Sequence, residues 1–497
     1  MQTLLSSEQM RNADDYTIAQ QQISSIDLME RAAAAFVRAF ILHVPNLQTR
    51  ISIFCGKGNN GGDGLVITRL LYQQGYPDLQ VFIANFSDKA SPDFIQNERR
   101  LQETGLVAKT LVEPGQFQNL QTEVIIDALL GSGLNQPLSG KFLSLVQQIN
   151  ALNKKIYAVD VPTGFFADGA MPLTYEGIQA YLTICFQRPK PNFFFPESAK
   201  ATDRFEVVDI GLEETFIEEQ QGEFLLVGVD DIKALHQPRK SFSHKGSFGH
   251  ALLIAGDTNT MGAAILNAKG CLYAGAGLTT LSIPASGLST LNTAIPEVMY
   301  LDRADIREKN MAKYHAIGMG SGLGTSTAAK ALLELVLDLH RPLVLDADAL
   351  NLMANYPALR HNLAPGCILT PHVKEFDRLF GEHLSWYDRL ATARVQAQRL
   401  KCVIVLKNRY TFIVDGGKQV YINPTGNPGM AQGGMGDVLT GVLTAFMAQG
   451  KTALESALLA CYFHGKAGDD LADDHYNVTA SQVAENIPLI TRHLICS

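Results

Sequence analysis

Short apolar runs alternate with amphipathic stretches along the first part of the chain. After an expected opening helix at 7–44, which ends just ahead of Pro45, the apolar runs predict buried strands and the stretches between them predict helices. The predicted strands are 51–55, 80–84, 123–126, 156–159 and 204–208, and the predicted helices are 65–74, 93–104 and 141–152. Strands that alternate with helices in this way predict a parallel sheet covered on both faces.

A second alternating series follows the acidic, Gln-rich stretch at 213–223, which we interpret as a boundary region. The chain from Gly436 onward is predicted to be helical, and the two series are not copies of each other. We therefore expect an α/β protein with two domains, at 1–215 and 225–497, of which the first is Rossmann-like with three layers. The predicted strands of the second domain are 251–255, 279–283, 316–319, 343–345, 367–369, 403–406 and 411–414.

The first candidate for chemistry is a glycine-rich segment, residues 56–64, between a predicted strand and a helix. Glycines let the backbone approach a phosphate, and a helix N-terminus offers free N–H groups and positive potential. A standard dinucleotide-binding fold would place an acidic residue at the end of the next strand, but that strand runs into Asn85. The alternative is a tight strand-to-helix turn without a ligand.

Two further strands of the first half end at a carboxylate. Asp127 runs into Gly131-Ser132-Gly133, and Asp160 runs into Val161-Pro162-Thr163-Gly164. Ligands of an open parallel sheet bind outside the carboxyl ends of the strands, so these loops are expected to converge with the glycine-rich segment. Asp127 is then a candidate cation ligand and Asp160 a candidate base, whereas the alternative is that each caps a turn.

The strongest segment of the second half is residues 423–437, in which four glycines come shortly before a predicted helix that carries Asp437 in its first turn. The backbone N–H groups there can form an anion hole, and Asp437 can accept a proton from a bound hydroxyl. The alternative is a capped helix with a flexible lead-in. Asp346 and Asp348 are candidates for Mg²⁺ contacts, although they could equally maintain the strand–loop geometry. His372, beside Glu375, is a candidate site residue or a simple turn residue.

The motifs of the first half resemble the three signatures of the NAD(P)H-hydrate epimerases. The resemblance rests on 59–64, 127–133 and 160–164. It implies that potassium (K⁺) is coordinated by Asn60, Asp127 and Thr163, and that Asp160 is catalytic. The residues implied to contact the hydrate are Asn59, Asn60, Gly61, Gly62, Asp63, Gly131, Ser132, Gly133, Leu134, Asn135, Gln136, Pro137 and Asp160.

The second half resembles the ribokinase-like superfamily and, within it, the ADP-dependent NAD(P)H-hydrate dehydratases. The resemblance rests on 423–437 and on the segments 244–250, 318–324, 344–351 and 369–376. Two positions depart from the family pattern, because Asn408 and Ser321 replace a glycine and a proline. The resemblance implies that ADP binds with magnesium (Mg²⁺). The implied hydrate contacts are Ala263, Gly322, His372 and Asp437, and the implied ADP or AMP contacts are Lys407, Asn408, Arg409, Tyr410, Thr411 and Gly436.

Together the two resemblances imply an enzyme that repairs hydrated NADH and NADPH. The first domain would interconvert the R and S hydrates at C6, because the hydrate is a hemiaminal that inverts when the ring nitrogen expels the oxygen or the ring opens. The second domain would use Asp437 to activate the hydrate hydroxyl for attack on ADP, and would release NAD(P)H, AMP and phosphate. The alternatives are a kinase of a small alcohol, such as a vitamin precursor or sugar, and a nucleotide-binding regulator without catalysis.

Composition adds information about the setting of the protein. Of its 497 residues, 46% are hydrophobic, and the net charge of -8 with no long Lys/Arg block argues against nucleic acid as a partner. The 7 cysteines form no Cys-x-x-Cys pair, which argues against a disulfide framework or zinc site and for a reducing compartment. The first residues do not resemble a signal peptide, and no apolar run is long enough to cross a bilayer. We expect a cytoplasmic homo-oligomer whose partners are the small molecules NADHX, NADPHX and ADP.

Overall fold

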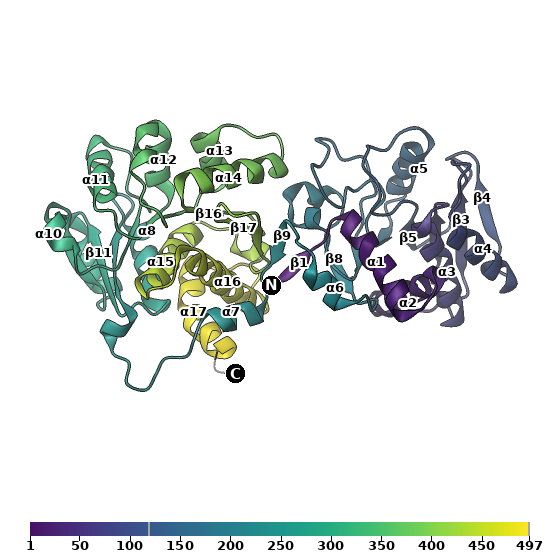
Figure 1. The fold of residues 1–497 in the computed structure, drawn as a ribbon, viewed down its shortest axis with the longest axis horizontal. Helices are drawn as coiled ribbons and strands as arrows, with labels where there is room; N and C mark the ends of the chain where they lie inside the picture. The colour runs from purple at the N-terminus through teal and green to yellow at the C-terminus, as the bar shows by residue number, and fades with distance from the viewer. Residues whose placement is uncertain (118–119, 496–497) are drawn as a thin grey trace. The chain divides into compact units, whose positions relative to one another are not determined.

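The computed structural model describes residues 1–117 and 120–495, which divide into two compact units (Figure 1). The N-terminal unit comprises Thr3–Glu223 with Leu384–Tyr387, and the C-terminal unit comprises Met1–Gln2, Phe224–His383 and the chain from Asp388 onward. Each unit is built around one sheet flanked by helices, which confirms the predicted α/β class. Every helix among the described residues is too short or too polar to span a lipid bilayer.

The sheet of the N-terminal unit has the strand order β4-β3-β2-β5-β6-β7-β8, and all neighbouring strands pair in parallel. The parallel sheet was predicted, but β4 and β7 were not. β4 carries the exposed Lys109 and Thr110 at the edge of the sheet, which weakens its apolar signal. The strands are β2 (Ile51–Cys55), β3 (Leu79–Ala84), β4 (Ala108–Leu111), β5 (Val124–Ala128), β6 (Lys155–Val159), β7 (Leu182–Phe186) and β8 (Phe205–Val208).

Helices cover both faces of this sheet and bury alternate residues of its strands. Ile51 and Ile53 of β2 pack into one apolar cluster with the first helices, whereas Phe54 packs into a second cluster with Leu145 of α5. The stretch interpreted as a boundary forms the short helix α6, and its Ile217 is buried. The helices are α1 (Ser7–Gln21), α2 (Ser25–His43), α3 (Asn59–Gln73), α4 (Pro92–Glu103), α5 (Gly140–Ala151) and α6 (Glu214–Glu219).

The predicted opening helix at 7–44 was wrong, because the chain breaks it into α1 and α2. Gln22 adopts a left-handed conformation with φ of 54°, which ends α1. Ser24 then caps α2 through hydrogen bonds shared with Asp27. The break contains no glycine or proline, the residues that most often mark one, so the sequence pattern did not reveal it.

The sheet of the C-terminal unit has the strand order β1-β9-β18-β17-β16-β15-β14-β13-β10-β11-β12. All predicted strands are present within a residue of their expected ends, but β1, β9, β12 and β18 were not predicted. β17 pairs antiparallel with both neighbours, and β10 to β16 pair in parallel. The strands are β1 (Gln2–Leu4), β9 (Phe224–Leu226), β10 (His250–Ile254), β11 (Leu278–Ile283), β12 (Met299–Asp302), β13 (Ala316–Met319), β14 (Leu343–Leu345), β15 (Ile368–Leu369), β16 (Val403–Leu406), β17 (Thr411–Val414) and β18 (Val420–Asn423).

The helices α8 and α15–α17 share one apolar cluster with this sheet, and α11–α13 lie across the sheet from them (Figure 1). The chain from Gly436 onward is helical, as predicted. The helices are α7 (Val229–Leu235), α8 (Met261–Tyr273), α9 (Leu288–Ala294), α10 (Glu308–Met311), α11 (Thr327–Asp338), α12 (Ala347–Asn355), α13 (Val373–Phe380), α14 (Trp386–Leu400), α15 (Met435–Ala448), α16 (Ala453–Ala472) and α17 (Ala480–Ile495).

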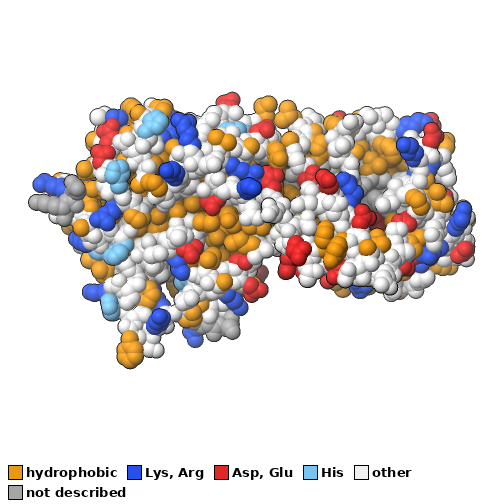
Figure 2. All heavy atoms as spheres, viewed as in Figure 1, with side chains coloured by type: hydrophobic (Ala, Val, Ile, Leu, Met, Phe, Trp, Pro, Cys, Tyr) orange, Lys and Arg blue, Asp and Glu red, His pale blue; other side chains and the backbone are white. Residues whose placement is uncertain are grey.

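The structure describes most of the cysteines of the chain, and Figure 2 draws one face of the molecular surface. The six described cysteines are free and buried, and Cys496 lies outside the described residues. On the face drawn in Figure 2, acidic and basic side chains are interspersed.

Two glycines allow α15 to lie directly against α8. A Cβ on Gly441 would lie 2.0 Å from the carbonyl oxygen of Asn267, and one on Gly270 would lie 2.2 Å from that of Val438. Both distances are far below van der Waals contact, so no side chain fits there. The close approach of these glycines therefore holds α15, which carries Asp437 in its first turn, directly against α8.

We expect Gly441→Ala to destabilise the C-terminal unit by about 3 kcal/mol, because overpacking against backbone outweighs a helix-propensity gain of up to about 1 kcal/mol. Gly262→Ala in α8 is the matched control, since nothing lies within 4 Å of its Cβ. That control should leave the free energy of unfolding unchanged or raise it. Urea unfolding followed by circular dichroism measures both variants, and equal stability of the two would contradict the close helix contact.

Candidate active sites

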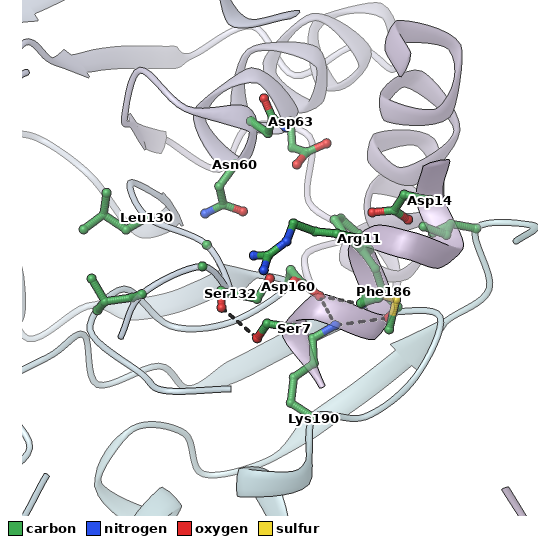
Figure 3. Close-up of a pocket in the computed structure, with 16 residues that line it drawn as sticks. Ser7, Arg11, Asp14, Asn60, Asp63, Leu130, Ser132, Asp160, Phe186 and Lys190 are labelled. Atoms are coloured by element: carbon green, nitrogen blue, oxygen red, sulfur yellow. Dashed lines mark hydrogen bonds and ion pairs between the residues drawn. The ribbon is translucent and has the colours of Figure 1, made fainter. Parts of the chain in front are cut away.

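A cavity of about 470 Å³ opens at the carboxyl ends of β2, β5 and β6 in the N-terminal unit (Figure 3). These strands are parallel neighbours, so the loops that follow them meet at one edge, which is the convergence expected from the sequence. The helix α1 supplies a further wall. The lining residues are Ser7, Met10, Arg11, Asp14, Asn59, Asn60, Asp63, Leu130, Gly131, Ser132, Gly133, Leu134, Asp160, Phe186, Lys190 and Ile210.

Asp160 directly follows β6 and lines this cavity in an unusual backbone conformation. Its φ is 63°, a value that an aspartate adopts seldom and that is concentrated at functional sites. Its Oδ1 accepts a hydrogen bond from the Phe186 backbone N–H at 3.1 Å and lies 2.9 Å from the Lys190 ammonium. These contacts hold the carboxylate in one orientation at the cavity wall.

Lys190 is a site residue that the sequence analysis missed. Its side chain is buried, and burial alone would lower its pKa, but the charge of Asp160 raises the pKa overall, so it stays a cation. The available signal was weak, namely a lysine between Pro189 and Pro191 soon after an apolar run. Only the pairing of β6 with β7 brings this lysine to Asp160.

Asp127 lies behind the cavity wall, almost fully buried in β5. Its carboxylate accepts hydrogen bonds from the Thr163 hydroxyl and the Thr163 backbone N–H, both at 2.7 Å, and from the Leu129 backbone N–H at 3.2 Å. Burial raises the pKa of Asp127 to about 6, although these hydrogen bonds lower it. No cationic side chain among the described residues pairs with it, so its charge is compensated by hydrogen bonds alone.

Three further polar residues face or border the same cavity. Asn60, at the start of α3, has an amide nitrogen that is buried without a hydrogen-bond partner in the described part of the chain. Burial raises the pKa of Asp63 well above its usual range and that of Asp14 to about 7. Asp14 was not predicted as a site residue, because the polar positions of its helix gave no sign of which face lies against the sheet edge.

Several predicted hydrate contacts do not line the cavity. Gly61 and Gly62 are buried inside α3, where a Cβ on Gly61 would lie 1.9 Å from the Gly56 carbonyl oxygen. The role visible for Gly61 is thus close packing of the helix on its loop. Residues 135–137 also lie outside the lining set, and they follow Leu134 along the chain.

The C-terminal unit holds a larger cavity of about 760 Å³ at the carboxyl ends of β14, β15 and β16 and the N-terminus of α15. Of the predicted site residues it is lined by His372, Lys407, Asn408, Arg409, Thr411, Gly436 and Asp437, but not by Tyr410. The other lining residues are Asp346, Ala347, Glu375, Asn423, Thr425, Gly426, Asn427, Pro428, Met430, Ala431, Gln432, Gly434, Met435, Leu439, Cys461, His464 and Gly465.

Asp437 stands in the first turn of α15, as the sequence predicts, with glycines before it. Gly434 caps the helix with φ of 93°, a conformation that favours glycine, and the first-turn N–H groups have no intrahelical partner. Burial raises the pKa of Asp437 to about 6, while a hydrogen bond from Ser321 lowers it. A carboxylate with a pKa near neutrality beside free N–H donors can take a proton next to a bound anion.

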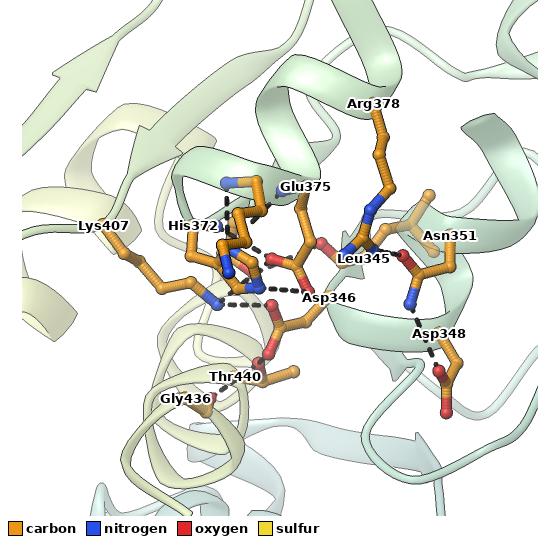
Figure 4. Close-up of polar contacts among 12 residues, drawn as sticks. Leu345, Asp346, Asp348, Asn351, His372, Glu375, Arg378, Lys407, Gly436 and Thr440 are labelled. Atoms are coloured by element: carbon orange, nitrogen blue, oxygen red, sulfur yellow. Dashed lines mark hydrogen bonds and ion pairs between the residues drawn. The ribbon is translucent and has the colours of Figure 1, made fainter. Parts of the chain in front are cut away.

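A polar network beside Asp437 contains a buried ion pair (Figure 4). The Lys407 ammonium lies 2.7 Å from Asp346 Oδ1 and 4.0 Å from Glu375, and the Thr440 hydroxyl donates to Asp346 Oδ2 at 2.9 Å. Burial alone would lower the pKa of Lys407, but Asp346 and Glu375 raise it overall, so the side chain remains a cation at the cavity. A Cβ on Gly436 would lie 3.4 Å from the Lys407 ammonium nitrogen, so the glycine keeps space open between lysine and helix.

His372 and Asp348 have structural roles as well as their predicted ones. His372 caps α13, where its Nδ1 accepts hydrogen bonds from the Lys374 and Glu375 backbone N–H groups. Burial lowers the pKa of His372 although Glu375 opposes this, so the ring is neutral at pH 7. The two oxygens of Asp348 accept hydrogen bonds from the Gly324 N–H and the Asn351 amide.

Ala263 and Gly322 lie against each other, and neither is among the residues that line the cavity. A Cβ on Gly322 would lie 3.0 Å from the Ala263 Cβ, and Gly322 has φ of 61°. Ser321, the position that departs from the family pattern, is buried, accepts a hydrogen bond from the Asn267 amide at 3.1 Å, and contacts Asp437. This serine therefore links the β13 loop to the candidate base.

The geometry of the C-terminal cavity suits an anionic phosphate ligand with a neighbouring hydroxyl substrate, in an α/β unit with helices on both faces. A ribokinase-like superfamily protein of Enterococcus faecalis matches it at a TM-score of 0.51 and 30% identity, over 55% of this chain and 98% of that one. The ADP/ATP-dependent NAD(P)H-hydrate dehydratase of Bacillus subtilis, co-crystallised with ATP and Mg²⁺, is 30% identical over 54% of this chain and 97% of that one, with a TM-score of 0.48. The match to the Enterococcus faecalis protein places the unit in the ribokinase-like class of folds.

The family follows from matches over the whole chain. A family model described as NAD(P)H-hydrate dehydratase matches residues 251–489, and one described as YjeF-related protein N-terminus matches residues 25–192. The bifunctional NAD(P)H-hydrate repair enzyme of Coxiella burnetii is 33% identical over 478 residues, which cover 95% of this chain and 96% of that protein. The chain belongs to the family of bifunctional NAD(P)H-hydrate repair enzymes, and the resemblance drawn from its motifs is confirmed.

Proposed function

We propose that this protein repairs hydrated NADH and NADPH by two reactions. The first interconverts the R and S hydrates at C6, and the second dehydrates the S hydrate at the expense of ADP and gives NAD(P)H, AMP and phosphate. The observation that carries the proposal is a pair of cavities that each hold a carboxylate placed for proton transfer, in a chain of this family. We assign the epimerase to residues 1–215 and the dehydratase to residues 225–497.

In the epimerase site we assign proton transfer to Asp160. Its Oδ1 is held by Lys190 and the Phe186 N–H, which keeps the carboxylate directed at the cavity. The hydrate would lie between this carboxylate, the start of α3 at Asn59 and the glycine-containing loop at Gly131. Loss or gain of the C6 oxygen requires a proton to move with it, and a fixed carboxylate can supply that movement.

We assign a K⁺ site to Asn60, Asp127 and Thr163. Amide, carboxylate and hydroxyl oxygens are hard ligands that suit such an ion. The buried charge of Asp127 has no cationic partner among the described residues, and this supports a cation there. When bound, K⁺ would balance that charge and stabilise the anionic substrate nearby. Asp160 is then left free for proton transfer.

In the dehydratase site Asp437 would take the proton from the hydrate hydroxyl. The freed oxygen would attack the terminal phosphate of ADP, the bond from that phosphorus to the bridging oxygen would break, and AMP would leave. The first-turn N–H groups of α15 and the Lys407 ammonium would hold and stabilise that phosphate. The phosphorylated oxygen then leaves as phosphate as the ring nitrogen expels it. Loss of a neighbouring proton restores the dihydropyridine ring.

We assign the nucleotide to Lys407–Thr411 and Gly436, with Ala263, Gly322 and His372 at the hydrate. Mg²⁺ would accompany the phosphates of ADP. The carboxylate oxygens of Asp346 and Asp348 already accept hydrogen bonds from protein donors, so the contacts favour their role in maintaining the strand–loop geometry. Among the described residues, no group of three or more His, Cys, Asp and Glu is placed to hold a metal. Free, buried cysteines support the cytoplasmic setting, and the homo-oligomer stays a prediction.

Asp437→Asn should abolish dehydration while the fold and ADP binding persist, because loss of a general base costs about 10²–10⁴ in rate.

Asp160→Asn should instead affect only epimerisation. The variant should consume the S hydrate at the normal rate, and it should consume the R hydrate only as fast as that hydrate converts to the S form without enzyme. Recovery of reduced-nicotinamide absorbance with each purified epimer and ADP measures both variants. Near-normal turnover by Asp437→Asn, or equal consumption of both epimers by Asp160→Asn, would contradict the two assignments.

Dehydration should weaken on the acid side of pH 6. Asp437 must be ionised to accept a proton, and its pKa is raised to about 6, so the rate should fall as the pH drops through that value. Ser321→Ala removes a hydrogen bond that lowers this pKa, so its acid limb should move to higher pH. Profiles of kcat/KM for the S hydrate at saturating ADP test this, and coincident acid limbs for the two proteins would argue against Asp437 as the base.

Asp127→Ala should impair epimerisation and remove its dependence on K⁺, while dehydration of the S hydrate continues unchanged. If Asp127 only caps a turn, its loss should cost about 0.5–2 kcal/mol of stability and leave the cation response intact. The rate of epimerisation, measured for the wild type and the variant in a potassium buffer and in a buffer whose cation is too large for the site, distinguishes these outcomes. Wild-type epimerisation that ignores K⁺, with no anomalous scatterer beside Asp127, would rule out the cation site.

A further inference from the structure

One wall of the N-terminal cavity is a single face of α1, and its acidic residue has no role in the steps above. Ser7, Met10, Arg11 and Asp14 lie at helical spacing and all line the cavity. No residue in the described part of the chain forms a hydrogen bond or ion pair with the Asp14 carboxyl group. Asp160, in contrast, is held by Lys190 and the Phe186 N–H.

The groups around Asp14 determine its charge. Lys190 and Arg11 are the cations at the cavity, and the other acids near it are Asp160, Asp63 and Asp15. Burial raises the pKa of Asp14 to about 7, opposed by Lys190 and reinforced by Asp160. Burial raises the pKa of Asp63 well above its usual range, and the neighbouring carboxyl groups of Asp160 and Asp14 add to this shift. Asp14 can gain and lose a proton near neutral pH.

We propose that Asp14 is a second proton-transfer residue of the epimerase site, acting on the hydrate from the α1 wall while Asp160 acts from the end of β6. The two carboxyl groups come from different elements around one cavity (Figure 3). The inference rests on the proposed epimerase function and deepens it. We take the route in which the ring nitrogen expels the oxygen. On that route oxygen leaves from one face of the ring and enters from the other, so each face needs a group that handles its proton.

The reaction balances with these two residues and one water molecule. Asp14 in its acid form gives a proton to the departing hydroxyl, the C6–O bond breaks, and the lone pair of the ring nitrogen forms a C6–N double bond. Water then adds to C6 from the other face, the double-bond electrons return to nitrogen, and Asp160 accepts the proton. The opposite epimer uses the pair in reverse, with Asp160 as the acid and Asp14 as the base.

The test compares Asp14→Asn with Asp15→Asn in the full chain. Asp14→Asn should slow interconversion of the purified hydrates by about 10²–10⁴ in both directions and keep hydrate affinity, because the amide has the shape of the acid but carries no transferable proton. Asp15→Asn, on the exposed face of the same helix, should behave as the wild type. Asp14→Glu should recover part of the lost rate.

The pH profile separates proton transfer from a structural role. The active pair carries one proton, so wild-type kcat/KM should be bell-shaped in both directions, with an alkaline limb near pH 7. That limb should be absent from the residual activity of Asp14→Asn. In water labelled with heavy oxygen, each epimerised hydrate should carry a solvent oxygen, and retention of the original oxygen would overturn the proposed exchange.

The remaining outcomes distinguish this inference from the function on which it rests. Failure of the wild type to interconvert the hydrates would overturn the proposed epimerase itself. If the wild type is active and Asp14→Asn stays within about threefold of it, only the role of Asp14 fails. Loss of hydrate affinity in parallel with the rate would make Asp14 a binding residue and would also overturn the inference.

Discussion

The parallel pairing of neighbouring strands is the constraint on which both cavities depend. Because β2, β5 and β6 run in the same direction, the loops that carry Asn60 and Asp160 lie at the same edge of the sheet. About half of the unit separates these two residues along the chain. The strands β13 to β16 repeat this arrangement and bring Asp346 and Lys407 together. In each unit the chemistry therefore depends on strand order, and a reversed strand would carry its polar end to the opposite edge.

Each unit then has to bury carboxylates at that edge, and it does so in different ways. Asp160 and Asp346 each pair with a lysine that follows a neighbouring or nearby strand, at 2.9 Å and 2.7 Å. Asp127 has hydrogen bonds but no cation, and Asp14 has neither among the described residues. Burial of a charge costs several kcal/mol unless it is compensated, so carboxyl groups of the last kind shift their pKa towards neutrality. Asp14 can therefore exchange a proton near neutral pH.

Much of this organisation could be predicted from the sequence. The alternation of short apolar runs with amphipathic stretches was enough to predict the parallel sheets, because a strand that is buried on both faces is apolar along its whole length. The glycine-rich segments and the strand-end aspartates indicated where ligands would bind, because ligands of an open parallel sheet bind outside the carboxyl ends of its strands. The break at Gln22 and the edge strand β4 escaped, because neither carries a glycine, a proline or a continuous apolar run. The interior strand β7 was also missed, although it is buried along its whole length.

What the sequence by itself determined is which residues could carry chemistry, namely Asp127 and Asp160 in the first half and Asp437 in the second. Only the tertiary structure decided their partners: Lys190 reaches Asp160 through the β6–β7 pair, Ser321 reaches Asp437 across the β13 loop, and Asp14 reaches the cavity from α1. The physical reason is that a residue's type and local pattern are properties of a short segment. Its burial, ion pairs and pKa instead depend on segments that are distant in the chain and adjacent only after folding.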